Sequence, residues 1–171
     1  MGKEKLIKRL KQYYPLERFH AFFTFPLLTI YFIFKNPFLQ SIWFVYGMLL
    51  CIFILYQGQR YWKLKLWRLQ NKPFSESENI KFFNSAKRLN RILLFVSPII
   101  LVVQILIVDW STQDFNIIFW STMANVFAFL EYFNYYHTQL MVDNTSDFQY
   151  IIRNQKLKTA SLAKDLKENR I

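Results

Sequence analysis

Three polar residues, Glu131, Asn134 and His137, follow a long apolar run and have side chains that are able to take part in chemistry. The sequence has only 2 histidines, and the other, His20, follows Glu17 by three positions in the stretch ERFH. Residues three apart lie on the same side of a helix. Helical bundles hold metals with a carboxylate and an imidazole at this spacing, and the same pair suits acid–base chemistry. A metal site, an acid–base site and a purely structural polar cluster are therefore three hypotheses for this group.

Glu131 is expected to point into a helix bundle rather than out of it. At about 100° per residue, it shares a helix face with neighbours that are mostly small, namely Ser121, Ala124, Ala128, Tyr135 and Thr138. Small residues mark the face on which helices approach each other closely. Asn134 and His137 are each turned by a further ~60°, so one helix cannot aim all three polar side chains at one centre.

A site around Glu131 therefore needs a partner from a second helix. With a rise of about 1.5 Å per residue, Glu131 and His20 are expected at nearly equal depth in the bundle. We predict that Glu131 meets His20, with the longer side chain of Arg18 as the alternative. The predicted intramembrane polar cluster consists of Glu131, His20, Glu17, Asn134, His137 and Arg18.

Four apolar segments supply the helices that position these residues. They cover about residues 19–35, 38–57, 92–109 and 115–136, in a sequence that is 53% hydrophobic and 20% aromatic. A bilayer core of about 30 Å needs roughly 20 helical residues, so each segment is close to spanning length. A soluble bundle does not account for stretches such as FVYGMLLCIFILY, which have no polar stripe at helical spacing. We predict an all-α fold, an integral membrane four-helix bundle over residues 19–142.

The basic residues predict how this bundle is oriented. All of the 22 lysines and arginines except Lys35 fall in the lead 1–18, the loop 58–91 or the tail 143–171. Positively charged connections stay on the cytoplasmic side, so both termini are expected in the cytoplasm of a multi-pass plasma membrane protein. Residues 35–37 and 109–114 are then outside. The net charge of +11 is explained without nucleic acid, for which no binding motif is present.

The cytoplasmic regions are expected to contact lipid. KEKLIKRLKQYY alternates apolar and basic residues at helical spacing, which predicts an amphipathic N-terminal interfacial helix, with a new helix beginning at Pro15. Further short cytoplasmic helices are predicted in the loop and the tail. The loop also combines basic and aromatic side chains, and the predicted anionic-lipid site consists of Lys63, Lys65, Arg68, Trp62 and Trp67.

These observations favour a membrane protein that acts through interactions. Its expected partners are anionic lipids and a membrane-protein partner or further copies of itself. A membrane-embedded enzyme or metal protein that acts on a lipid-soluble substrate at the cytoplasmic leaflet is the first alternative, and an oligomeric channel or transporter subunit is the second. No cofactor is predicted, because three glycines cannot form a phosphate-binding loop and the lone Cys51 lies inside a predicted span.

Overall fold

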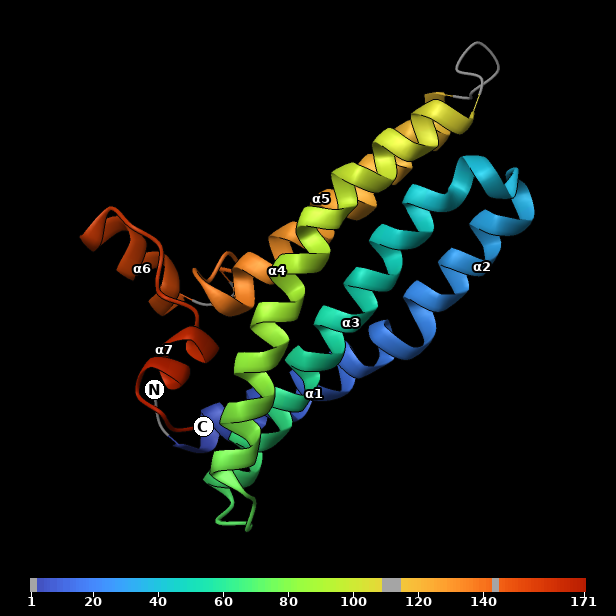
Figure 1. Ribbon diagram of the computed structural model, residues 1–171. Coiled ribbons are helices and arrows are strands. Elements are labelled where there is room, and N and C mark those ends of the chain that lie inside the picture. The colour runs from blue at the N-terminus through green and yellow to red at the C-terminus, as the bar shows by residue number, and fades with distance from the viewer. Residues whose placement is uncertain (1–2, 109–114, 143–144) are drawn as a thin grey trace.

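The computed structural model describes residues 3–108, 115–142 and 145–171, and in this part of the chain the regular elements are all helices, with no strand beyond an isolated bridge between Thr138 and Thr159. Figure 1 shows the long helices lying side by side, with two short helices of the tail at one end. The predicted all-α fold is therefore confirmed. The expected external connection at residues 109–114 lies outside the described residues.

The first helix is longer than the sequence indicated. α1 (Lys3–Phe19), the π-helical turn η1 (His20–Thr24) and α2 (Phe25–Lys35) follow one another without a break and form one rod in Figure 1. Pro15 lies inside α1, so the prediction that a new helix begins at this residue is wrong. Proline has a helical φ and removes a single backbone hydrogen bond, which the packing of α1 along α3 compensates.

α3 (Phe38–Leu69) and α4 (Glu76–Ile107) are each 32 residues long, and both are long and apolar enough to cross a membrane. They extend through most of the predicted loop 58–91, and only residues 70–75 connect them. Asn71 has a φ of 56°, a left-handed conformation that asparagine tolerates, and it ends α3. The chain therefore reverses within a few residues.

In α4, the distribution of polar and apolar side chains is the reverse of that in a helix of a soluble bundle. The buried residues of α4 are mostly polar or small, namely Asn79, Phe83, Ala86, Asn90, Ser97 and Gln104. Its exposed face is apolar and includes Phe95 (77% exposed) and Leu106 (80% exposed). α2 and α5 (Phe115–Tyr136) also expose large apolar side chains. A hydrocarbon surrounding favours this arrangement, because inside it only polar contacts distinguish helix from lipid.

Two polar clusters join α3, α4 and α5. In the first, Asn125 donates to the Trp43 carbonyl (2.9 Å) and accepts from Ser97 (2.6 Å). In the second, Gln57 and Asn90 form a reciprocal amide pair with distances of 3.1 and 2.8 Å. These are hydrogen bonds of the kind that hold helices together within lipid.

The inward face predicted for α5 is found in the structure. Ser121, Ala124 and Ala128 are buried there. The Tyr136 hydroxyl donates to Gln57 at 2.6 Å, which attaches α5 to the second cluster. The rotation of α5 about its axis is therefore fixed by this bond.

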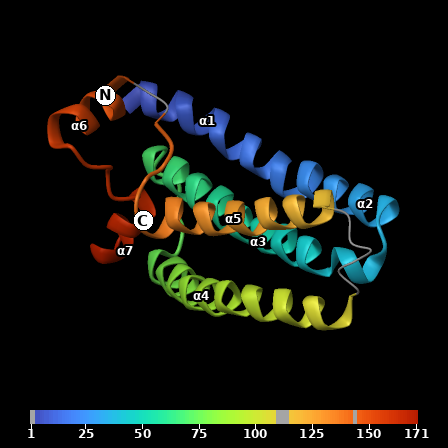
Figure 2. The ribbon, with the colours of Figure 1, turned by 90° about the horizontal axis from the view of Figure 1, so that it is seen from above.

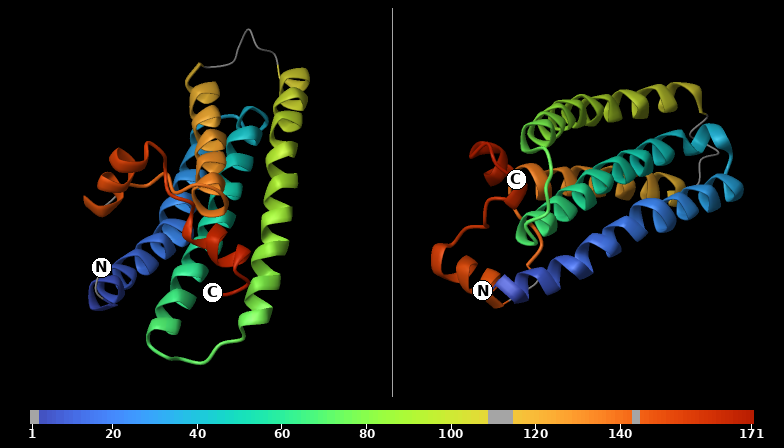
Figure 3. Two further views of the ribbon diagram at one scale, coloured as in Figure 1. Left: turned by 90° about the vertical axis from the view of Figure 1, so that its left-hand side faces the viewer. Right: turned by 90° about the horizontal axis from the view of Figure 1, so that it is seen from below.

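The tail closes the end of the bundle that carries most of the basic residues. α6 (Thr145–Asn154) projects to the side, whereas α7 (Ser161–Lys167) packs against the long helices (Figures 2 and 3). Asp165 of α7 accepts hydrogen bonds from Tyr61 (2.6 Å) and Lys65 (3.0 Å) of α3. The last residue, Ile171, is fully buried, and its backbone N–H donates to Glu76 of α4. The tail thus belongs to the folded unit.

The amide pair generates a prediction about stability. In Asn90→Ala, Gln57 loses the Asn90 side of the amide pair inside the bundle, so we expect the protein to be destabilised by ~1–3 kcal/mol. Leu89→Ala is the control, because Leu89 lies on the exposed face of the same turn. Thermal unfolding in detergent measures both. Equal melting temperatures for the two variants would show that the amide pair does not stabilise the bundle.

Candidate functional site

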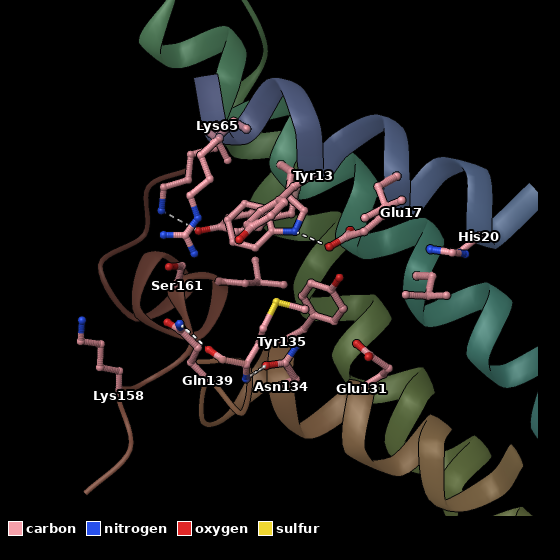
Figure 4. A pocket seen from close by; sticks show the side chains of 18 of the residues that line it. Tyr13, Glu17, His20, Lys65, Glu131, Asn134, Tyr135, Gln139, Lys158 and Ser161 are labelled. Carbon is pink, nitrogen blue, oxygen red and sulfur yellow. Dashed lines mark hydrogen bonds between the residues drawn. The ribbon is translucent and has the colours of Figure 1, made fainter. Parts of the chain in front are cut away.

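A cavity with a volume of about 790 Å³ lies between α1, α3, α5 and the segment that leads into α7. We call it the interfacial pocket. Leu10, Leu55, Phe127 and Leu162 contribute to its apolar walls. In Figure 4, the carboxyls of Glu17 and Glu131 lie towards one end of the pocket, and Lys65 and Lys158 lie at the other. The pocket therefore combines apolar walls with an acidic end and a basic end.

Glu17 is the most unusual group in this pocket. The indole N–H of Trp62 donates to its Oε1 at 2.7 Å, whereas its Oε2 is buried near the Tyr135 hydroxyl without a hydrogen bond of good geometry. Burial away from water, with a smaller contribution from nearby Glu131, raises the pKa of the Glu17 carboxyl to about 8. The carboxyl is thus mostly neutral at pH 7.

Gly58 creates the space that Glu17 and Tyr135 share. A Cβ atom on this residue would lie 2.3 Å from the Tyr135 ring and hydroxyl and 2.8 Å from Glu17 Oε2. Both distances are far below van der Waals contact, so only glycine lets α1 and α5 bring these side chains together against α3. In Figure 4, Tyr135 lies between the two carboxyls.

The predicted hydrogen bond between Glu131 and His20 is not formed. The Nδ1 of His20 pairs with Thr24 at 3.1 Å within its own helical segment, because the wider π-helical turn brings these side chains together. Arg18, the alternative partner, donates a hydrogen bond to the Tyr14 hydroxyl on the exposed side of α1. Glu131 is instead adjacent to Asn134 on its own helix. Glu131, His20, Glu17 and Asn134 nevertheless all line the interfacial pocket.

His137 lies apart from this group. It is exposed, stacks on Phe133 with ring centroids 4.8 Å apart and pairs with the Tyr132 hydroxyl at 3.2 Å. Asn134 has a structural task as well, since its Oδ1 accepts the N–H of Leu140 where the chain leaves α5. Within the described residues, no three side chains of His, Cys, Asp or Glu gather closely enough to hold a metal ion.

The residues predicted to bind anionic lipid do not form one surface. Trp62 and Lys65 turn into the interfacial pocket. Lys63 instead stacks over the ring of Trp67, 4.8 Å from its centroid, and Arg68 is exposed. All five residues lie on α3, and because successive residues of a helix are turned by about 100°, their side chains point in different directions around its axis.

Acidic partners accompany the lysines at the basic end of the pocket. Lys65 forms an ion pair with Asp165, and Lys158 forms one with Asp147. Sequence reasoning missed Lys158 and Gly58 as parts of the site. A charge in a tail and a glycine between two glutamines carry no signal until the helices are placed.

Comparisons with protein-family models, with curated proteins and with solved structures found no match to this chain.

The pKa of Glu17 predicts a pH dependence of stability. An acid whose pKa is higher in the folded protein binds more protons there than in the unfolded chain, between about pH 4.5 and about pH 8. Stability therefore falls as the pH rises through this range, with a slope of at most ~1.4 kcal/mol per pH unit for one proton. Glu17→Gln should remove this contribution, which melting curves from pH 5 to 9 measure.

Glu78→Gln is the control, because Glu78 is an exposed acid at the start of α4. It should retain the pH dependence of the unmodified protein. A Glu17→Gln variant with the same pH dependence would contradict the assignment of a raised pKa to Glu17.

Proposed function

We propose that this chain is a multi-pass membrane protein that binds one amphipathic molecule of the lipid class in the interfacial pocket, through interaction rather than catalysis. The observation that carries the proposal is the buried, partnerless Oε2 of Glu17. An unsatisfied buried polar atom costs ~1–3 kcal/mol, and a headgroup that donates a hydrogen bond to it offsets this cost. The apolar walls of the pocket suit the hydrocarbon part of the same molecule.

The membrane topology is part of the proposal. Four crossings, over about residues 19–35, 38–57, 92–109 and 115–136, fit the apolar outer faces of α2, α4 and α5 and the confinement of most basic residues to one end. Both termini are then cytoplasmic at the plasma membrane, and the interfacial pocket opens near the inner headgroups. Lys63, Trp67 and Arg68 remain candidates for contact with anionic headgroups outside the pocket.

An enzyme that acts on a lipid-soluble substrate is a second candidate. The observation in its favour is the pKa of Glu17, because a value of about 8 suits a group that exchanges protons near neutral pH. Self-association, a protein partner and a channel or transporter role stay predictions from the sequence.

Cysteine labelling tests the topology. In a Cys51→Ala background, a membrane-impermeant maleimide added to intact cells should label Asn36→Cys, between α2 and α3, and should not label Ser85→Cys on α4. Permeabilised cells provide the control, in which Ser85→Cys should react. Labelling of Ser85→Cys in intact cells would contradict the proposed orientation.

Native mass spectrometry of protein extracted in a neutral detergent tests binding. We expect one amphiphile per chain on the unmodified protein and a severalfold lower occupancy in Leu6→Trp, because Leu6 lines the pocket and the larger ring fills part of it. Ile92→Trp is the matched control, since Ile92 is exposed on α4. Equal occupancy in all three proteins would place the amphiphile on the outer surface and would overturn the proposal.

A further inference from the structure

The two lysines of the interfacial pocket have ion-pair partners, whereas its two glutamates have none in the described part of the chain. At the basic end, Lys65 and Lys158 are each paired with an aspartate. At the acidic end, neither Glu17 nor Glu131 forms an ion pair within the described residues. When Glu17 is ionised, the acidic end therefore has no ion pair to balance its charge.

The geometry around Glu17 also suits a cation that has an apolar body. Four aromatic rings line the pocket near the two carboxyls, those of Tyr13, Phe25, Trp62 and Phe127. Ring faces attract cations, and the attraction is strongest where water is excluded. An anionic headgroup at this end would be repelled once the carboxyls are ionised.

We propose, on the basis of the function proposed above, that the ligand of the interfacial pocket is a lipophilic monovalent cation, which pairs with Glu17 and has Glu131 as a second carboxyl nearby. Glu17 lines the pocket and is the contact residue. The apolar body lies against Leu55 and Phe127, on the side where the pocket adjoins the apolar helices.

This pairing implies an exchange of the cation for a proton. Glu17 is protonated below about pH 8, and a bound cation favours the carboxylate, so the O–H bond breaks and the proton passes to the solvent. One positive charge enters the pocket for each proton that leaves, and no other bond changes. Affinity for the cation should therefore rise with pH up to about pH 8.

Several other titratable groups line the same pocket as Glu17. α5 contributes Glu131 and Tyr135, and η1 contributes His20. Tyr61 and Lys65 of α3 share hydrogen bonds with Asp165. Arg9 and Tyr13 of α1 form a cation–aromatic contact at 5.0 Å, and Lys158 is paired with Asp147. Glu17 is distinguished from all of these by a buried oxygen that has no partner.

The test uses two probes of the same shape and opposite charge. Tetraphenylphosphonium and tetraphenylborate are both permanently charged, so neither titrates itself. Equilibrium binding to the full chain in nanodiscs of zwitterionic lipid is measured, with empty nanodiscs subtracted. We expect the phosphonium to bind and the borate not to bind. The apparent Kd for the phosphonium should fall about tenfold per pH unit between pH 6 and 7.5, since one proton is released.

Glu17→Gln should bind the phosphonium at least about tenfold more weakly and without the pH dependence, whereas Glu78→Gln should behave like the unmodified protein. The melting temperature of each variant shows that it is folded, and Glu131→Gln provides a second variant if Glu17→Gln does not fold. Equal binding of the phosphonium by the folded variants and the unmodified protein would overturn the inference, as would equally tight binding of the borate.

The same experiments separate this inference from the proposed function. If neither probe binds but a co-purified amphiphile is lost in Leu6→Trp, the cationic ligand is wrong and amphiphile binding stands. If neither probe binds and no amphiphile depends on Leu6, both proposals are overturned.

Discussion

The reciprocal amide pair of Gln57 and Asn90 is the contact on which the rest of this bundle depends. α4 turns its apolar side outward, so in an apolar surrounding it gains little from packing alone, and polar groups must hold it. The Tyr136 hydroxyl joins α5 to the same pair. Three helices are thus fixed at one level by side chains whose hydrogen-bonding capacity is largely satisfied within the bundle.

The position of the interfacial pocket follows from this attachment. Because Tyr136 faces Gln57, the preceding residue, Tyr135, is turned by about 100° towards α1. It meets Glu17 over Gly58, where the absence of a side chain lets three helices approach. The carboxyl of Glu17 consequently lies in a dry environment, where Trp62 donates to it and the Tyr135 hydroxyl lies close. The tail then closes the basic end through Asp165, and Glu17 Oε2, the one buried side-chain oxygen without a partner among the described residues, lies at the acidic end of the pocket.

A buried carboxyl with one partnerless oxygen is a cost to folding that packing elsewhere must offset. Natural proteins keep such costs where binding or chemistry uses them. In this protein, the group that opposes stability above about pH 4.5 is also the group that a cationic ligand would neutralise. Stability and binding would therefore be linked through one proton on Glu17.

The sequence by itself determined the helical class, the apolar segments and the inward face of α5, because composition and a 3.6-residue period are properties of a single helix. It also identified Glu17, His20, Glu131 and Asn134, and these four residues do line one pocket. The hydrogen-bond partners of these residues could not be predicted from the sequence. His20 pairs within its own helix, and Glu17 reaches Trp62, 45 positions away. Only the tertiary structure decided these contacts, since a rotation of ~100°, the angle of one residue, is enough to turn a side chain towards a different neighbour.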